Sequence, residues 1–217
     1  MDEIILVDKP ANMSSFGVVA RIRRVLSTEA GHKVKVGHSG TLDPFATGLL
    51  ILLAGKATKR SNEFLKLDKT YEATIRLGAT STTGDPEGEI TEKDVVRPDD
   101  EMVKMAVRSF IGEIEQKVPQ YSAVKIDGER AYKLARKGVA VEMPTRKVHI
   151  YNIEILNYSW PTLVIRCHVS SGTYVRTLGE DIGKKLGVGG YLTALRRTEV
   201  GNYKVEDAKK LSDFGVY

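Results

Sequence analysis

The chain has 217 residues and a formal net charge of +5, long enough to bury a substantial core in one large domain or two closely packed lobes. No apolar run approaches the roughly 20 residues of a membrane-spanning helix, and the N-terminus lacks the layout of a signal peptide, so we predict a cytoplasmic protein that does not contact membranes. Cys167 is the only cysteine, which excludes an internal disulfide and a cysteine-rich metal site.

The N-terminal part of the chain is predicted to hold a strand and then an amphipathic helix. Residues 4–7 form an apolar run that is typical of a short buried strand. Ser14 or Ser15 can then cap a helix. Its apolar residues keep helical spacing and are Val19, Ile22 and Leu26. Its basic residues are predicted to point largely outward and are Arg21, Arg23 and Arg24.

The segment from residue 49 to residue 89 is predicted to contain several short elements in succession. Residues 49–53 are apolar, but the run is too short to decide between strand and helix. Residues 56–67 are typical of a mostly polar helix. Alternation over residues 70–77 predicts a strand with Tyr71 on its inward face. Glycines and a proline within residues 80–89 predict a loop.

The remaining elements are a second set of helices and strands. An amphipathic helix is predicted after Pro98 and Asp99, with an apolar face of Val103, Ala106, Val107 and Phe110. Residues 129–137 indicate a short basic helix, residues 147–156 a strand, and residues 162–169 an alternating strand that buries Cys167.

A final helix follows Ser171 and Gly172, because apolar residues recur there at helical spacing; they are Val175, Leu178, Ile182 and Leu186. Tyr174 and Arg176 are therefore predicted at a strand-to-helix junction, where side chains are held firmly. No strict βαβ repeat is present. We predict an α+β fold, with a mixed, largely antiparallel sheet flanked by helices.

The segment from Gly37 to Gly48 places one carboxylate, Asp43, in a glycine-rich turn between two apolar runs. Glycines allow close backbone approaches, and Pro44 restrains the chain directly after the acid. An Asp-Pro turn can also exist only to hydrogen-bond its own backbone. Here the simpler interpretation must also explain His38, which lies five residues upstream in the same segment. We therefore take Asp43 as the candidate nucleophile.

The charges are segregated along the sequence. Basic residues gather in two segments, which contain Arg21, Arg23, Arg24, Lys33 and Lys35, and Lys125, Arg130, Lys133, Arg136, Lys137, Arg146 and Lys147. Acidic residues gather between Asp85 and Glu101, which predicts an acidic edge. A basic face suits a polyanion, although basic helices are often merely solvated.

Other kinds of site do not fit. A phosphate-binding loop fails because Lys56 is followed by Ala57 and position 50 is Leu rather than Gly. The histidines lack the spacing of a zinc site, so no metal is predicted. A glycosidase usually needs a second acid beside its nucleophile, and no acid accompanies Asp43 in its loop.

The Asp43 segment closely resembles the G-H-x-G-x-L-D-P-x-A-x-G signature of the bacterial TruB-type tRNA pseudouridine-55 synthases. The similarity continues in the same order along nearly the whole chain. Further similar blocks are Lys9-Pro10, Lys69-Thr70-Tyr71, residues 118–125 with 128–132, and residues 171–178. The resemblance implies the pseudouridine synthase fold, with an active-site cleft crossing the middle of the sheet.

The resemblance also implies an activity. These enzymes convert a uridine, here expected to be uridine 55 in the T loop of tRNA, to pseudouridine without a cofactor. The base must be flipped out of the folded loop before the acid can reach it. We therefore expect a tRNA pseudouridine synthase that acts as a stand-alone monomer on the T arm.

The resemblance implies roles for individual residues. Asp43 corresponds to the catalytic acid, and Arg176 is expected to lie against it, because a cation there favours the ionised carboxylate. Tyr71 corresponds to a tyrosine that stacks on the target base and can accept its final proton. Tyr174 and Leu195 match positions that contact substrate, although Leu195 could equally be an ordinary core leucine.

The expected roles of His38 and Lys9 are less direct: His38 is expected to contact RNA near the opened stack, and Lys9 to support the loop or bind a phosphate. A noncatalytic RNA-binding protein on the same fold is the main alternative, but binding alone does not require Asp43, Tyr71 and Arg176 together. We expect residues 1–217 to form one catalytic domain without the C-terminal PUA domain common in this family.

Overall fold

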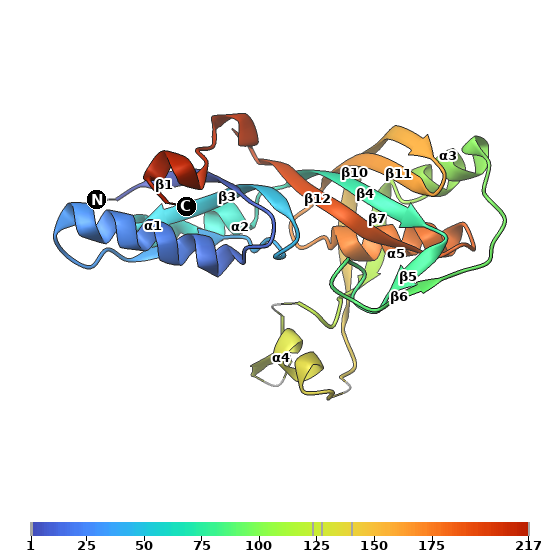
Figure 1. Ribbon diagram of the computed structural model, residues 1–217, viewed down its shortest axis with the longest axis horizontal. Helices are drawn as coiled ribbons and strands as arrows, with labels where there is room; N and C mark the ends of the chain where they lie inside the picture. The colour runs from blue at the N-terminus through green and yellow to red at the C-terminus, as the bar shows by residue number, and fades with distance from the viewer. Residues whose placement is uncertain (1, 123, 127, 140, 217) are drawn as a thin grey trace. The chain divides into compact units, whose positions relative to one another are not determined.

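The computed structural model describes residues 2–122, 124–126, 128–139 and 141–216 (Figure 1). The chain divides into two compact units. Unit 1 holds the described residues up to Glu72 and those from Ala194 onward, and unit 2 holds residues 73–193. Strands β4 (Lys69–Leu77) and β12 (Gly190–Val200) contribute residues to both units.

Unit 1 is built around strand β3 (Thr47–Ala54). Strand β1 (Ile4–Lys9) pairs antiparallel with it from Ile4 opposite Leu53 to Lys9 opposite Gly48, and β2 (Val36–Ser39) is also antiparallel to it. Strand β12 pairs with β3 in parallel through Arg196 and Arg197, and it pairs antiparallel with β13 (Tyr203–Lys204). This arrangement makes β3 the central strand of the unit.

The undecided apolar run at residues 49–53 is a strand because both of its faces are covered. Leu50 and Leu52 pack with the buried side of helix α1 (Ser15–Ala30). Leu49, Ile51 and Leu53 pack with Phe64 and Val200 on the opposite side. A strand buried on both faces loses the alternation that would distinguish it from a buried helix in the sequence.

The boundaries of α1 confirm the predicted helix. The hydroxyl of Ser14 accepts a hydrogen bond from the backbone N–H of Gly17 at 3.0 Å, so Ser14 is the N-cap. The helix ends at Gly31, whose φ of 68° is a conformation that favours glycine. The predicted apolar positions Val19 and Ile22 are buried, and Figure 1 shows α1 running beside β1 and β3.

The prediction of a single helix over residues 56–67 was wrong. A 3-10 segment, η1 (Gly55–Arg60), comes first, and a short α-helix, α2 (Ser61–Leu65), follows it. The hydroxyl of Thr58 donates to the carbonyl of Gly55 at 2.7 Å, a three-residue spacing that suits the tighter 3-10 turn. Two further 3-10 segments, η2 (Val205–Asp207) and η3 (Leu211–Phe214), complete unit 1.

In unit 2, the long hairpin of β10 (Thr145–Ser159) and β11 (Thr162–Val169) lies between β4 and β7 (Gly112–Lys117). Strand β10 is antiparallel to both of its neighbours. Two short hairpins accompany this sheet, β5 (Ala79–Ser81) with β6 (Ile90–Glu92), and β8 (Lys125–Ile126) with β9 (Glu129–Arg130). The pairings confirm a mixed, mostly antiparallel α+β architecture.

Three α-helices belong to unit 2, as far as its residues are described: α3 (Asp100–Arg108), α4 (Ala131–Arg136) and α5 (Val175–Lys185). Asp99 caps α3 by accepting from the N–H of Met102 at 2.7 Å, but Phe110 lies beyond the helix end, contrary to expectation. Ser109 directly follows the last helical residue, and its hydroxyl donates to the carbonyl of Ala106 at 2.7 Å.

Other boundaries in unit 2 also differ from the prediction. Residues 80 and 81 belong to β5 rather than to a loop, and residues 129 and 130 form β9, so that α4 is shorter than the predicted basic helix. The block at 118–125 includes Ala123, which lies outside the described residues. Cys167 is fully buried, as predicted.

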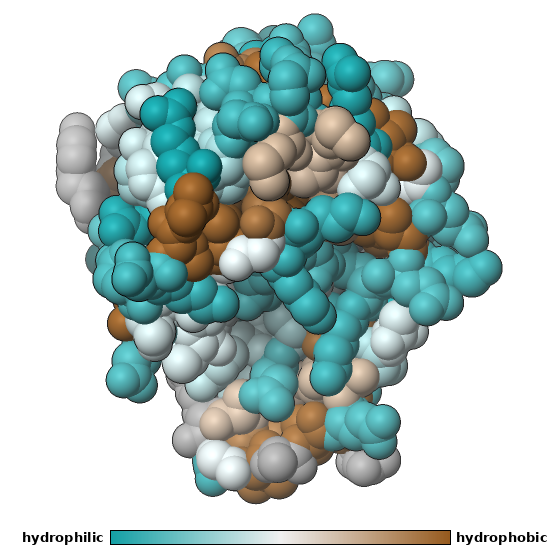
Figure 2. Space-filling view, turned by 90° about the vertical axis from the view of Figure 1, so that its right-hand side faces the viewer, coloured by the Kyte–Doolittle hydropathy of each residue, from teal (hydrophilic) through white to brown (hydrophobic). Residues whose placement is uncertain are grey.

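The segment containing β8, β9 and α4 has a small apolar cluster of its own (Figure 1, yellow-green to yellow). Val118, Ala131 and Met143 form its buried centre, and Tyr174 packs against it. Elsewhere in unit 2 apolar side chains are exposed, among them Val96, and Figure 2 shows hydrophobic patches interrupted by hydrophilic side chains. In the part of the chain that the structure describes, no helix is long and apolar enough to cross a membrane.

Candidate active site

Asp43 lies half-buried in the loop that joins β2 to β3 in unit 1. We call residues 40–48 the Asp43 loop. Gly48 has a φ of 103°, and a Cβ at this position would lie 2.2 Å from the carbonyl oxygen of Arg197. A larger residue is therefore excluded by both backbone conformation and space. The close approach lets β12 pair with the end of this loop.

Ser15, the first residue of α1, holds the loop immediately before Asp43. Its hydroxyl donates to the carbonyl of Leu42 at 2.9 Å and accepts from the N–H of Leu42 at 2.8 Å. Both Ser15 and Leu42 are buried. Because buried hydrogen bonds are costly to break, these two bonds fix the backbone next to the carboxylate.

Lys9 supports the loop immediately after Asp43. Its side chain is fully buried, and its ammonium donates to the carbonyl of Pro44 at 3.1 Å. The same group donates to the carbonyls of Pro10 and Met13, at 2.8 and 2.6 Å. Of the two roles expected for Lys9, these contacts are those of a loop support.

Arg197 connects the two ends of the Asp43 loop. It is 1% exposed, and its Nε donates to the carbonyl of Leu49 at 2.8 Å while Nη2 donates to that of Gly40 at 3.1 Å. The planar guanidinium can make both bonds at once, which a lysine could not do with the same geometry. The sequence did not reveal this role; its one signal was that two arginines directly follow Leu195.

The other site residues predicted in unit 1 lie on strands near this loop. His38 is half-buried on β2, directly before it. Tyr71 on β4 is 8% exposed and Leu195 on β12 is 7% exposed. Strands β4 and β12 are neighbours, as the hydroxyl of Thr198 donates to the carbonyl of Thr70 at 3.2 Å. The inward position predicted for Tyr71 is confirmed.

Arg176 and Tyr174 belong to unit 2, at the start of α5. Arg176 is 4% exposed, and its Nη1 donates to the carboxylate of Asp85 at 3.2 Å and to the carbonyl of Thr83 at 3.0 Å. Its Nη2 donates to the carbonyl of Tyr121 at 2.6 Å. The predicted strand-to-helix junction is confirmed, while the predicted contact between Arg176 and Asp43 concerns two units and stays a prediction.

Asp85 was predicted in the acidic edge, and that prediction was wrong. Its side chain is 6% exposed, and its other carboxylate oxygen accepts from Thr83 Oγ1 at 2.5 Å and from the N–H of Glu87 at 3.0 Å. An acid is buried only when a cation pairs with it, and a count of acids along the sequence cannot reveal such a partner. The only local signal was that Pro86 follows Asp85, as Pro44 follows Asp43.

Tyr174 is held at its backbone by Gln116 on β7. The amide of Gln116 donates to the carbonyl of Tyr174 at 3.0 Å and accepts from its N–H at 2.8 Å. The guanidinium of Arg146 lies 5.4 Å from the Tyr174 ring centroid, within the range of a cation–π interaction. A basic side chain and an aromatic ring therefore lie together at this junction.

Two ionisable groups near these residues are displaced from their ordinary pKa. Burial, together with the nearby charge of Arg197, lowers the pKa of Lys69 to about 8. The ammonium of Lys69 donates to the carbonyls of Leu65 and Leu67. In unit 2, burial raises the pKa of Glu180 to about 7 against the opposing effect of Arg176.

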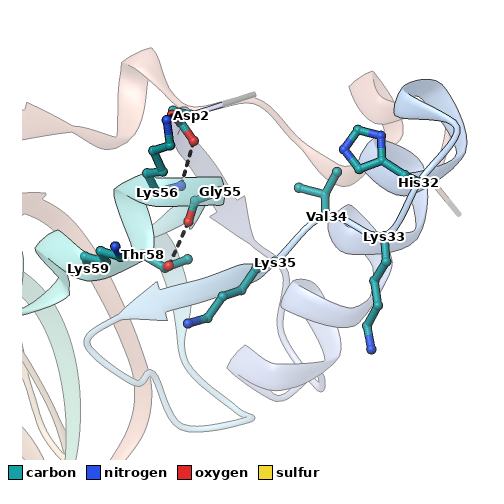
Figure 3. Close-up of a pocket in the computed structure, with 9 residues that line it drawn as sticks. All are labelled: Asp2, His32, Lys33, Val34, Lys35, Gly55, Lys56, Thr58 and Lys59. Atoms are coloured by element: carbon teal, nitrogen blue, oxygen red, sulfur yellow. Dashed lines mark hydrogen bonds and ion pairs between the residues drawn. The ribbon is translucent and has the colours of Figure 1, made fainter.

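A hollow of about 330 Å³ in unit 1 is lined largely by basic side chains (Figure 3). Its lysines are Lys33, Lys35, Lys56 and Lys59. Lys56 lies against Asp2, with a nitrogen-to-oxygen distance of 3.8 Å, whereas Lys33 and Lys35 point to the same side of the segment that carries them. This hollow contains members of the first basic segment predicted from the sequence.

The second basic segment carries less uncompensated charge than its sequence indicated. Lys137 forms an ion pair with Glu129 at 2.8 Å, and Lys147 forms one with Glu113 at 2.9 Å. The side chain of Arg136 lies outside the part of the chain whose side chains are described. The lysine-lined hollow and the remaining basic residues of this segment are both candidates for binding an anion.

Comparison with known proteins identifies the family. Residues 23–175 match the TruB family pseudouridylate synthase N-terminal domain, and residues 176–216 match the tRNA pseudouridylate synthase B C-terminal domain. The chain belongs to the TruB family. The predicted enzyme class, a tRNA pseudouridine synthase, is thereby confirmed.

Relatives named tRNA pseudouridine synthase B are similar over nearly all of this chain. The protein from Corynebacterium efficiens is 46% identical over 97% of this chain and 71% of its own length. The protein from Cupriavidus metallidurans is 48% identical over 96% of this chain and 65% of its own length. The chain therefore spans about two thirds of these TruB relatives.

Solved structures agree with the predicted fold. One chain in the crystal structure of a Cbf5-Nop10-Gar1 complex is 31% identical with a TM-score of 0.75, over 97% of this chain and 52% of that chain. A crystal structure of a pseudouridylate synthase, 14% identical with a TM-score of 0.50, covers 99% of this chain and 73% of that one. The pseudouridine synthase fold is thus confirmed.

Proposed function

We propose that this chain isomerises uridine 55 in the T loop of tRNA to pseudouridine, with Asp43 as the nucleophile. The observation that carries the proposal is the support of the Asp43 loop from buried groups on both sides. Ser15 fixes the backbone before the acid, Lys9 fixes it after the acid, and Arg197 joins the loop ends. A site held in this way positions a reactive group before substrate binds.

The chemistry requires one nucleophile and one proton acceptor. The bond between the ribose and the base nitrogen breaks, the base turns, and a bond forms from the ribose to carbon 5 of the base. The proton on carbon 5 is then removed, and the nitrogen released from the ribose gains a proton, so that atoms and charge balance. Asp43 can act through attack on the base, attack on the ribose, or elimination to a glycal.

The remaining site residues have distinct proposed roles. Tyr71 stacks on the target base and its hydroxyl accepts the carbon-5 proton, while Arg176 stabilises the ionised form of Asp43. Tyr174 and Leu195 contact the substrate. These roles follow from the family resemblance and agree with the burial of Tyr71 and Arg176.

The RNA partner is proposed from charge and family membership together. Lysines around the hollow in Figure 3 can neutralise phosphates of the T arm, and His38 can contact the RNA near the opened stack. We propose that residues 1–217 act as one catalytic domain and as a monomer in the cytoplasm. We propose that the reaction proceeds without a metal or another cofactor.

Replacement of Asp43 by asparagine tests the nucleophile. We expect Asp43→Asn to abolish isomerisation while RNA affinity stays within about threefold, because the amide is nearly isosteric but not nucleophilic. The measurement is release of tritium from carbon-5-labelled uridine in a tRNA transcript. Asp207→Asn is the matched control, since Asp207 is an exposed acid of the same unit.

Activity of Asp43→Asn within a few-fold of the parent would refute the role of Asp43. RNA binding by the parent without tritium release would instead favour the noncatalytic RNA-binding protein. The two outcomes are distinct because binding and turnover are measured separately.

A further inference from the structure

The outer face of α1 carries an exposed aromatic side chain that the proposed chemistry does not use. Phe16 is 64% exposed, compared with 36% for Ile4 and 42% for Leu65 in the same unit. Single exposed apolar residues are common, so exposure alone carries no functional meaning. The position of Phe16 and the chemistry of its neighbours are what distinguish it.

Phe16 directly follows the residue that holds the Asp43 loop. Ser15 is hydrogen-bonded in both directions to Leu42, which directly precedes Asp43. These two bonds and the 3.8 Å spacing of consecutive Cα atoms place the Cα atoms of Phe16 and Asp43 at most about 15 Å apart. An RNA loop whose target base meets Asp43 therefore has neighbouring nucleotides within reach of Phe16.

Arg23 extends the exposed ring into a larger surface. It lies two helical turns after Phe16 on the same side of α1, and its guanidinium carbon is 6.0 Å from the centroid of the Phe16 ring. A phenyl ring and a guanidinium are both planar groups on which nucleobases stack. The pair thus offers an aromatic face beside a positive charge.

The surrounding charge favours an anionic ligand. Arg21, Arg23 and Arg24 take part in none of the ion pairs found among the described residues. The only acidic residue of α1 is Glu29, near its C-terminal end. An uncompensated basic surface attracts phosphates and does not favour a purely apolar partner.

We propose that Phe16 and Arg23 form a stacking platform for an unpaired nucleobase of the RNA, close in the same loop to the uridine that reaches Asp43. This inference rests on the proposed function. A nucleobase covers the exposed ring, and the adjacent phosphates meet the arginines. The platform binds RNA and takes no part in the chemical step, so it acts on affinity and not on turnover at saturation.

Binding of a T-arm hairpin to Phe16 variants tests the platform. The variants are made in the Asp43→Asn background, where the RNA is not converted during the measurement. We expect Phe16→Ala to weaken binding about five- to 150-fold, which corresponds to the 1–3 kcal/mol typical of stacking on one base. Phe16→Leu should bind as weakly as Phe16→Ala, because leucine is apolar but has no aromatic face.

Phe16→Trp should restore binding to within about threefold and show quenching of its added tryptophan fluorescence by RNA. Val96→Ala is the control for loss of an exposed apolar side chain, since Val96 is 89% exposed. We expect its affinity for the hairpin to be unchanged. Thermal unfolding of each variant should match the parent, because exposed substitutions change stability little.

Unchanged affinity in Phe16→Ala would overturn the platform. Full binding by Phe16→Leu would also overturn it, and would indicate an apolar contact, such as one with a protein, instead of stacking. Tritium release is measured in parallel with Asp43 intact. If the parent releases no tritium, the proposed function fails, whereas the effect of Phe16 on RNA binding is judged independently.

Discussion

Removal of the charge on Asp85 tests whether the buried ion pair with Arg176 organises unit 2. In Asp85→Asn the amide oxygen can keep the hydrogen bonds from Thr83 and Glu87. The amide nitrogen then faces the guanidinium, and neither group can accept a hydrogen bond from the other. The variant therefore leaves a buried cation without its anion while it changes shape very little.

The expected loss of stability follows from the burial of both partners. The side chains are 4% and 6% exposed, and the nitrogen and oxygen are 3.2 Å apart. At this distance the gross attraction is about 5 kcal/mol for an effective dielectric constant of about 20. Loss of one partner from a buried pair costs about 3–5 kcal/mol. Arg176 retains the carbonyls of Thr83 and Tyr121, so we expect about 3 kcal/mol.

The assay is urea denaturation, with thermal unfolding as a second measurement. A loss of about 3 kcal/mol corresponds to about 6–12 °C in Tm for a chain of this size. Glu154→Gln is the matched control in the same unit, because Glu154 pairs with Arg166 at 3.1 Å while their side chains are 54% and 46% exposed. This exposed pair should contribute at most about 1 kcal/mol. Equal stability losses in the two variants would refute the importance of burial.

Two further predictions concern pH and salt. Burial raises the pKa of Glu180 to about 7 from an ordinary 4.5, so its contribution to stability is fully present below pH 4.5 and is lost as pH rises through 7. Glu180→Gln should remove this loss of unfolding free energy, whose slope in the parent is at most about 1.4 kcal/mol per pH unit. Identical pH dependence of the unfolding free energy in variant and parent, measured with urea between pH 4.5 and 7.5, would contradict the prediction. A T-arm hairpin should be nearly as good a substrate as whole tRNA, and its affinity should fall roughly tenfold or more between 50 and 200 mM salt. An inert hairpin would show that contacts beyond the T arm are essential. The double variant Lys35→Gln and Lys59→Gln should make the salt dependence of affinity shallower, because fewer lysines then contact phosphates.

The sequence alone predicted features that depend on neighbouring residues. Alternation identified β11 with its observed limits, and helical spacing identified the buried side of α1. The sequence narrowed the start of α1 to Ser14 or Ser15 and placed the start of α3 after Pro98 and Asp99, because a cap acts on backbone groups two or three residues away. The Asp43 loop was recognisable for the same reason, since its glycines and Pro44 constrain the local backbone.

The tertiary structure decided the features that depend on residues distant in sequence. Whether Leu49 to Leu53 form a strand depended on what covers each face, which no local pattern records. Arg197 is separated by 157 residues from Gly40, whose carbonyl it binds, and Asp85 by 91 residues from Arg176. A charged residue becomes buried only when the fold brings a partner close to it. The residues next to it in the sequence carry no information about that distant partner. The sequence therefore singled out Asp43 as the candidate acid, while the fold determined which buried side chains hold the loop that carries it.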